Sequence, residues 1–234
     1  MTIKGVLFDK DGTLLDFHAT WRPVLREAAL AAAGGEGARS ELLLALGGYD
    51  TALDRVRAGS LLAAGNTAEI AAAWAAELPG RDLEALIALL DDIFEQGGAR
   101  HATPLTELAP LFARLKGRGL ALGVATSDSL RGARASLARF GILEMIDFLA
   151  GYDSGHGVKP GPGMVEGFCA ATGLTAAEVA VLGDNRHDLE MGRSAGAGLV
   201  VGVLSGTGAR RELETLADHL LDNVADLEAL LERL

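Results

Sequence analysis

The sequence predicts an α/β fold, in which a doubly wound parallel sheet carries an inserted helical module. Short apolar runs of strand length alternate with helical patterns over most of the chain, which is typical of parallel sheets. Residues 17–98 break that alternation, because no convincing strand appears among them. Hydrophobic residues make up 49% of the 234 positions and charged residues 23%, which favours a packed globule over disorder.

The expected strands are short apolar runs bounded by glycine or charged residues. They cover 3–8, 120–125, 146–150, 179–182 and 198–203. Helical patterns lie between them at 104–118, 129–140, 162–172 and 188–195, and an amphipathic segment at 224–234 is expected to close one face. Strands that alternate with helices of this length predict crossover connections and therefore a parallel sheet.

The inserted segment is rich in alanine and leucine, and glycines and Pro79 separate its helical runs. We expect a core domain formed by residues 1–16 and 99–234 and an all-helical domain formed by residues 17–98. The two linkers are expected at Leu14–Asp16 and Gln96–Ala99.

Charge and composition exclude several classes of partner. The net charge of -11 argues against nucleic acid, which usually requires a basic surface. The single cysteine, Cys169, cannot form an internal disulfide and is typical of a reducing compartment. No run approaches the roughly 20 apolar residues that span a bilayer, and the apolar start is too short for a signal peptide. We therefore expect no membrane association and a cytoplasmic location.

Polar side chains follow four of the expected strands. Ligands of open parallel sheets bind beyond the carboxyl ends of the strands, so these side chains are expected to meet at one rim. In chain order they are Asp9, Asp11 and Thr13, then Thr126, Ser127 and Asp128, then Lys159, and finally Asp184, Asn185 and Asp188.

Carboxylates gathered in this way suit a magnesium site. Mg²⁺ prefers oxygen ligands and usually takes one or two carboxylates together with water and a phosphate oxygen. A negatively charged nucleophile would also be repelled by a phosphoryl group unless a cation lay between them. The expected magnesium ligands are Asp9, Asp11, Asp184 and Asp188, with Asp188 holding waters or other ligands in place.

The remaining groups at the rim complete a site for phosphoryl transfer. Asp9 is the expected nucleophile and would form an aspartyl phosphate. Asp11, two residues further on, would protonate the leaving oxygen and later take a proton from the hydrolytic water. Lys159 would neutralise phosphoryl charge, and Thr126 would donate a hydrogen bond to a phosphoryl oxygen.

Residues that bind the substrate are expected on both domains. Thr13 and Ser127 are candidates at the rim of the sheet, while Asp128 is expected to cap the following helix. In the helical domain the candidates that grip the leaving group are Trp21, Arg22 and Arg57.

Four motifs resemble those of the haloacid dehalogenase superfamily, in their usual order and spacing. They are Asp9-Lys10-Asp11-Gly12-Thr13, Thr126-Ser127, Lys159-Pro160 and Gly183-Asp184-Asn185-Arg186-His187-Asp188. The helical insert resembles the α-helical cap of that superfamily, and the whole chain looks most like its phosphoglycolate phosphatase-like group.

This resemblance implies a Rossmann-like core with a mobile cap. It also implies a Mg²⁺-dependent phosphatase for a small phosphorylated metabolite, phosphoglycolate-like or a sugar phosphate, as a monomer or homodimer. Two positions depart from the usual pattern. Lys10 stands where an apolar residue is common, and Ser127 stands where asparagine often follows the threonine.

Other functions fit less well or stay open. A haloacid dehalogenase acts on carbon without a metal and lacks the second aspartate, so Asp11 and Asp184 argue against it. A phosphonoacetaldehyde hydrolase needs a cap lysine, and none occurs between Lys10 and Lys116. A non-catalytic phospholigand-binding protein is expected to have lost some of these groups, which are all present. A phosphosugar mutase of the beta-phosphoglucomutase type uses the same catalytic core and remains an alternative.

Overall fold

A six-stranded sheet forms the larger part of the computed structural model, which describes residues 2–234. Every neighbouring pair of its strands is parallel, and the order is β5-β4-β1-β6-β7-β8. Numbered along the chain, this is the 3-2-1-4-5-6 order of a Rossmann-type doubly wound sheet, which reverses direction beside β1. The strands are β1 (Gly5–Phe8), β4 (Ala121–Ala125), β5 (Phe148–Ala150), β6 (Val179–Gly183), β7 (Leu199–Val203) and β8 (His219–Leu221).

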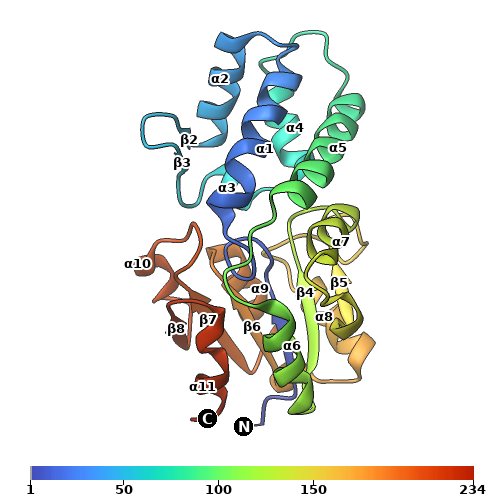
Figure 1. Ribbon diagram of the computed structural model, residues 1–234, viewed down its shortest axis with the longest axis vertical. Coiled ribbons are helices and arrows are strands. Elements are labelled where there is room, and N and C mark those ends of the chain that lie inside the picture. The colour runs from blue at the N-terminus through green and yellow to red at the C-terminus, as the bar shows by residue number, and fades with distance from the viewer. Residues whose placement is uncertain (1) are drawn as a thin grey trace.

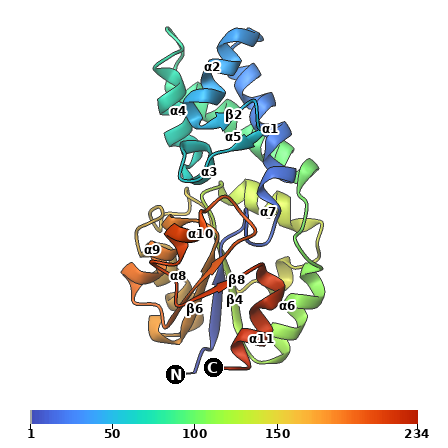
Figure 2. The same ribbon diagram turned by 90° about the vertical axis from the view of Figure 1, so that its left-hand side faces the viewer.

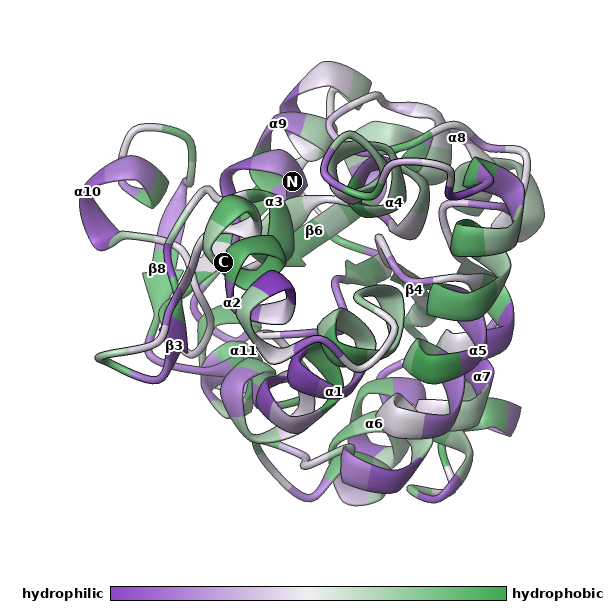
Figure 3. Cartoon of the chain, turned by 90° about the horizontal axis from the view of Figure 1, so that it is seen from above, coloured by the Kyte–Doolittle hydropathy of each residue, from purple (hydrophilic) through white to green (hydrophobic). Residues whose placement is uncertain are grey.

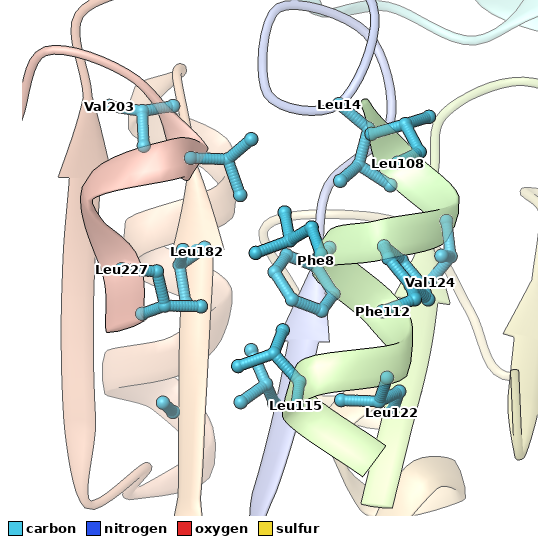
Figure 4. Close-up of a cluster of buried hydrophobic side chains, with 14 of the residues drawn as sticks. Phe8, Leu14, Leu108, Phe112, Leu115, Leu122, Val124, Leu182, Val203 and Leu227 are labelled. Carbon is cyan, nitrogen blue, oxygen red and sulfur yellow. The ribbon is translucent and has the colours of Figure 1, made fainter. Parts of the chain in front are cut away.

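Helices cover both faces of the sheet, because successive strand side chains point to opposite sides. Val6 and Phe8 lie in one apolar layer, and Leu7 lies in the other. Phe8 stacks on Phe112 with the ring centroids 5.4 Å apart (Figure 4). The first layer is covered by α6 (Leu108–Gly117), α7 (Leu130–Ala138) and α11 (Leu227–Leu231), and the second face by α8 (Gly163–Thr172), α9 (Arg186–Ala195) and α10 (Arg210–Leu213).

The inserted segment forms a separate helical body above the sheet (Figures 1 and 2). Its buried side chains, which run from Phe17 to Phe94 and include Trp74, form a cluster distinct from those of the sheet. We infer from this separation that the insert is a domain of its own, and we call it the cap. Its helices are α1 (Phe17–Ala32), α2 (Gly37–Gly47), α3 (Leu61–Ala64), α4 (Thr67–Ala75) and α5 (Leu83–His101).

The sequence predicts an all-helical cap, and this prediction is wrong. Two short antiparallel strands, β2 (Tyr49–Asp50) and β3 (Arg55–Val56), form a ribbon between α2 and α3. Each strand has only two residues, which is too short for the alternation that identifies a strand in a sequence. Tyr49 and Val56 pair in register and are both buried, so the ribbon is attached to the cap by apolar contacts.

The second expected linker is also wrong, because α5 continues through Gln96–Ala99 and ends at His101. The glycines in this stretch serve packing and not flexibility. A Cβ atom on Gly97 would lie 2.6 Å from Val24 Cγ1 of α1, so only glycine lets the two helices approach so closely. The chain returns to the sheet after His101, where Thr103 accepts a backbone hydrogen bond from Asp16 at 2.8 Å.

The expected strands and helices of the core are confirmed apart from their ends, and the sheet gains one strand, β8, and one short helix, α10. Neither segment shows a pattern that predicts an element, because β8 has only two apolar residues, Leu220 and Leu221, and α10 is a single turn of four residues. Across residues 2–234, no helix is long and apolar enough to cross a membrane. Figure 3 shows that the cap helices carry hydrophobic and hydrophilic residues side by side, as helices with one buried face do.

Candidate active site

The sheet brings three of the predicted side chains together at the ends of neighbouring strands. Phe8 is aligned with Val124 on one side and with Leu182 on the other, so β1 ends one residue before β4 and β6. Asp9 and Thr126 directly follow the first two of these strands, and Asp184 follows the third. These side chains are 7%, 1% and 3% exposed, so the rim beside the switch point is a buried polar site.

Lys159 joins two of the carboxylates. It arrives on the segment between β5 and α8, and its Nζ atom lies 2.6 Å from Asp9 Oδ1 and 2.5 Å from Asp188 Oδ1. Asp188 belongs to the first turn of α9, where its other oxygen accepts a hydrogen bond from the Asn185 backbone at 3.0 Å. This capping box fixes the Asp188 side chain, so the ammonium group of Lys159 is held between two oriented carboxylates.

The three carboxylates of this site carry more negative charge than the lysine can offset. Carboxylate oxygens of Asp9, Asp184 and Asp188 all lie within 4.8 Å of one another. Burial, and then the charge of Asp188, raise the pKa of Asp9 to about 7, although Lys159 acts in the opposite direction. Burial followed by the charge of Asp9 raises the pKa of Asp184 well above its usual value. Such shifts mean that the cluster lacks positive charge.

A divalent cation fits this donor set. Within residues 2–234, the buried Oδ2 atom of Asp9 has no hydrogen-bond partner, which is costly for a buried carboxylate oxygen. Three clustered carboxylates are hard oxygen donors of the kind that Mg²⁺ takes. A cation bound there would satisfy the free oxygen and restore the charge balance. Asp11, also predicted as a ligand, is not a member of this cluster.

Asp184 is held by the loop that follows β7. The Thr207 backbone donates to Asp184 Oδ2 at 2.6 Å, and the Ser205 hydroxyl donates to the Gly12 carbonyl at 2.7 Å. Gly12 has φ 93°, and a Cβ atom there would lie 2.5 Å from Asp184 Cγ. The loop after β7 therefore positions a site carboxylate.

Lys10 is the group at this site that sequence reasoning missed. Its side chain is fully buried, and its Nζ atom lies 2.6 Å from Asp11 Oδ2 and 3.0 Å from Asp128 Oδ2. The same atom lies 5.2 Å from the centre of the Trp21 ring in the cap, which is within cation–π distance. Burial alone would lower the pKa of Lys10, but Asp11 and Asp128 outweigh it and raise that pKa. The sequence feature that could have identified Lys10 is a lysine between two aspartates directly after a strand.

Asp128 does not cap the following helix, contrary to expectation. Ser129 is the N-cap of α7, and its hydroxyl accepts a hydrogen bond from the Gly132 backbone at 3.0 Å. Asp128 instead accepts from the Ser129 backbone at 2.8 Å and pairs with Lys10. The carboxylate is therefore part of the buried ion-pair network beneath Asp11.

One pocket lies between the core and the cap and is lined by both. The core contributes its buried charged groups, except for Lys10, and four other polar residues. The core residues that line the pocket are Asp9, Asp11, Asp128, Lys159, Asp184 and Asp188, with Thr126, Ser127, Asn185 and His187. Ser127 also joins the two domains, since its hydroxyl donates to the Ala64 carbonyl at 3.2 Å. The cap contributes mostly apolar side chains, namely Phe17, Trp21, Leu25, Leu62, Ala63, Ala64, Ile70 and Phe94, with Gly65 and Thr67.

Of the five predicted substrate-binding residues, the structure brings Trp21 and Ser127 to this pocket and places the other three elsewhere. Arg22 turns away, because Asp54 binds its guanidinium group at 3.2 Å and the His18 carbonyl accepts from its Nε at 3.0 Å. Arg57 is exposed and is not among the lining residues, and neither is Thr13, which is fully buried. None of these three side chains therefore lines the pocket.

Comparison with known proteins identifies the family. The family model of haloacid dehalogenase-like hydrolases matches residues 3–196. The chain belongs to this family. It is therefore an enzyme of the hydrolase class, as the four motifs predicted. The sheet order and the helical insert after β1 agree with the expected Rossmann-like core and cap.

Two known proteins with similar sequences are phosphatases. The chain is 29% identical over 196 residues to an N-acetylmuramic acid 6-phosphate phosphatase of Pseudomonas aeruginosa, covering 84% of this chain and 80% of the relative. It is 27% identical over 199 residues to a phosphoglycolate phosphatase of Yersinia pseudotuberculosis, covering 83% and 78% of the two chains.

Solved structures confirm the fold. A structure described as a predicted phosphoglycolate phosphatase from Haemophilus somnus superimposes with a TM-score of 0.73 at 20% identity, covering 98% of both chains. CbbY from Rhodobacter sphaeroides, solved in complex with phosphate, gives a TM-score of 0.70 at 23% identity and covers 97% of this chain and 96% of its own. The resemblance in fold thus extends over core and cap together.

Proposed function

We propose that this chain is a magnesium-dependent phosphatase that hydrolyses a small phosphate monoester through an aspartyl-phosphate intermediate. The observation that carries the proposal is the buried carboxylate of Asp9, which stands at the switch point of the sheet beside Lys159, Asp184 and Asp188. Family membership and the phosphatase relatives support the same reaction class. Phosphoglycolate and sugar phosphates are the first esters to test because the relatives act on such compounds, and they compare a leaving group that carries a carboxylate with leaving groups that carry no charge.

The cation would be held by Asp9, Asp184 and Asp188, the three carboxylates that cluster at the rim. When bound, it supplies positive charge that draws the phosphoryl group toward a negatively charged nucleophile. It also favours the ionised form of Asp9, whose pKa of about 7 in its absence would leave part of the nucleophile protonated at neutral pH.

In the first step, a carboxylate oxygen of Asp9 forms a bond to phosphorus while the bond between phosphorus and the ester oxygen breaks. Asp11 gives its proton to the departing oxygen, which leaves as an alcohol. In the second step, Asp11 takes a proton from water, the water oxygen bonds to phosphorus, and the bond to Asp9 breaks. Phosphate is released, and both aspartates return to their starting protonation states.

Two further side chains stabilise the charge on the transferred group. Lys159 is held 2.6 Å from Asp9 Oδ1, so its ammonium group stands beside the attacking carboxylate and can attract phosphoryl oxygens. The Thr126 hydroxyl already accepts a hydrogen bond from the Asp128 backbone at 3.1 Å, which leaves its proton free to donate to a phosphoryl oxygen. Both groups are preorganised by contacts within the core.

The test is release of phosphate from p-nitrophenyl phosphate and from a panel of small phosphate esters, with and without Mg²⁺. We expect Mg²⁺-dependent release by the native enzyme and a loss of at least ~1,000-fold for Asp9→Asn, which removes the nucleophile. Asp222→Asn, an exposed aspartate of the core, is the matched control and should retain full activity.

Equal inactivity of the native enzyme and Asp9→Asn across the panel would contradict the proposal. Product analysis with hexose phosphates separates hydrolysis from the mutase alternative, because a mutase returns an isomeric phosphate ester and not free phosphate. Thermal unfolding of each variant establishes that lost activity reflects lost chemistry.

A further inference from the structure

We infer that the substrate of this phosphatase has an uncharged, largely apolar leaving group, without a carboxylate or a second phosphate. The inference rests on the proposed function and concerns the cap side of the same pocket. Within the part of the chain that the structure describes, the cap lines the pocket with no charged side chain. The leaving group must lie on that side, because the phosphoryl group is held at the rim of the sheet.

No arginine of the cap lines the pocket, and three of them are engaged elsewhere. The guanidinium groups of Arg22 and Arg26 both bind Asp54, at 3.2 and 2.8 Å. Arg81 donates to the carbonyls of Ala31 and Ala32 on the far end of the cap. An anionic leaving group would therefore meet no cap cation, although two candidate arginines stood in the sequence.

The core side of the pocket adds a second reason, since its own charge is negative. Five carboxyl groups line it, and four of them stay charged when Asp11 carries the proton that it gives to the leaving group, against the ammonium groups of Lys10 and Lys159. The two positive charges of a bound divalent cation would offset the two negative charges of a phosphoryl dianion, so the net charge of the core side would stay negative. A further carboxylate on the substrate would be repelled by the floor and would lose its hydration without gaining a partner. The five carboxyl groups are those of Asp9, Asp11, Asp128, Asp184 and Asp188.

The shape of the cap wall favours apolar atoms. Trp21 and Phe94 meet edge to face, with centroids 5.5 Å apart and planes at 87°, and Leu25, Leu62 and Ile70 extend the wall. Burial of alkyl or aromatic groups against such a surface is favourable, and pockets of this kind bind ligands mainly through apolar contact. The rim hydroxyl of Ser127 already donates to the Ala64 carbonyl, so toward a substrate it can only accept a hydrogen bond.

A matched set of esters tests the inference in the native enzyme with Mg²⁺. The phosphate monoesters of 4-hydroxybutanoate, 4-hydroxybutanamide and 1-pentanol share one kind of leaving oxygen and differ at the far end, which is a carboxylate, a carboxamide or an alkyl group. We expect kcat/KM to be about tenfold or more lower for the carboxylate than for the carboxamide, and highest for the alkyl ester. A carboxylate ester hydrolysed as well as or better than the carboxamide would overturn the inference.

A variant at Ala63 sharpens the test. Ala63 is half-buried, lines the pocket and lies on α3, so a longer side chain can enter from the rim. Ala63→Lys should raise the carboxylate-to-carboxamide ratio of kcat/KM by about tenfold, whereas the uncharged Ala63→Gln should leave that ratio unchanged. Leu42→Lys places the same charge on the exposed outside of the cap and should also leave it unchanged.

The outcomes separate this inference from the proposed function. Hydrolysis of p-nitrophenyl phosphate together with a preference for the carboxylate ester would leave the phosphatase intact and remove only the inference. Absence of phosphate release from every ester, p-nitrophenyl phosphate included, would remove both. Should Ala63→Lys fail to fold, the native ratio decides the matter alone.

Discussion

The core side of the pocket is assembled from buried charges, whereas the cap side is assembled from apolar surface. On the core side, Lys159 and Lys10 each lie between two carboxylates, so every ammonium group has fixed partners. On the cap side, side chains such as Leu25 and Phe94 offer apolar contacts, which do not depend on a fixed direction as hydrogen bonds and ion pairs do. The two regions face each other across one cavity but are built by different physical means.

This difference separates two tasks. Charges held at fixed distances by strand ends and a capping box favour a reaction in which charge moves, because such groups need no rearrangement in the transition state. Apolar surface stabilises the bound substrate and the transition state about equally, so it selects among substrates and contributes little to turnover. Changes on the core side should therefore alter kcat, and changes on the cap side should alter relative KM values.

The sharpest test of this division is Asp11→Ala. We expect kcat to fall by about 100- to 10,000-fold, the usual contribution of general acid–base catalysis, while KM changes little. The Mg²⁺ concentration that gives half-maximal activity should also be unchanged, because Asp11 lies outside the carboxylate cluster. Steady-state kinetics at saturating Mg²⁺ measure both quantities. An unchanged kcat would show that Asp11 is not the acid. A changed KM with constant kcat would contradict the division in which the core side determines kcat and the cap side determines KM.

Lys10→Met changes the residue through which the core side contacts Trp21 of the cap. The substitution removes the cation shared by Asp11 and Asp128 and leaves Asp128 buried without a counter-charge. Loss of one partner from a buried ion pair typically lowers the free energy of unfolding by about 3–5 kcal/mol. Urea denaturation at neutral pH measures that loss.

A second substitution at Asp128 supplies the control for this experiment. Lys10→Met combined with Asp128→Leu should be less destabilised than the sum of the two single variants, because no charge is then left unpaired there. Strictly additive losses would mean that Lys10 and Asp128 do not interact as a buried pair. The kcat of Lys10→Met should fall as well, since Asp11 loses the contact that orients it.

Much of the core side could be predicted from the sequence. Asp9, Thr126 and Asp184 each directly follow a short apolar run, and the topology of a parallel sheet brings all such positions to one edge. Lys159 and Asp188 follow the same logic, with the start of α9 placing the second of them. A local pattern sufficed here because backbone geometry alone decides where the residue after a strand must lie.

The cap side could not be predicted in the same way. Whether an arginine enters the pocket depends on the rotation of its helix and on distant partners, and Arg22 is turned outward by Asp54, 32 residues away. The contact of Lys10 with Trp21 likewise depends on how the cap docks on the core. The ribbon of β2 and β3 was invisible for a different reason, since two residues cannot show a period.

The smallest expected effect concerns a site outside both regions. The Lys4 ammonium group, and then the backbone and hydroxyl of Thr175, hold the pKa of Glu178 at about 2, below its usual 4.5. Because this pKa is lowered in the folded state, the contribution of Glu178 to stability is present above about pH 4.5 and is lost as the pH falls through about 2. Glu178→Gln should therefore be slightly less stable than the native enzyme at pH 7, with a difference that shrinks toward pH 2.

Urea denaturation at pH 7, 5 and 3, together with kcat at pH 7, measures both halves of this prediction. Glu178 precedes β6 and so lies at the amino end of the strand whose carboxyl end carries Asp184. Turnover at neutral pH should then be unchanged, and a stability difference that is independent of pH would show that the Lys4 pair does not shift the titration of Glu178. A fall in kcat would show that catalysis depends on charges at the amino ends of the strands, opposite the pocket. The assignment of turnover to the core side of the pocket alone would no longer hold.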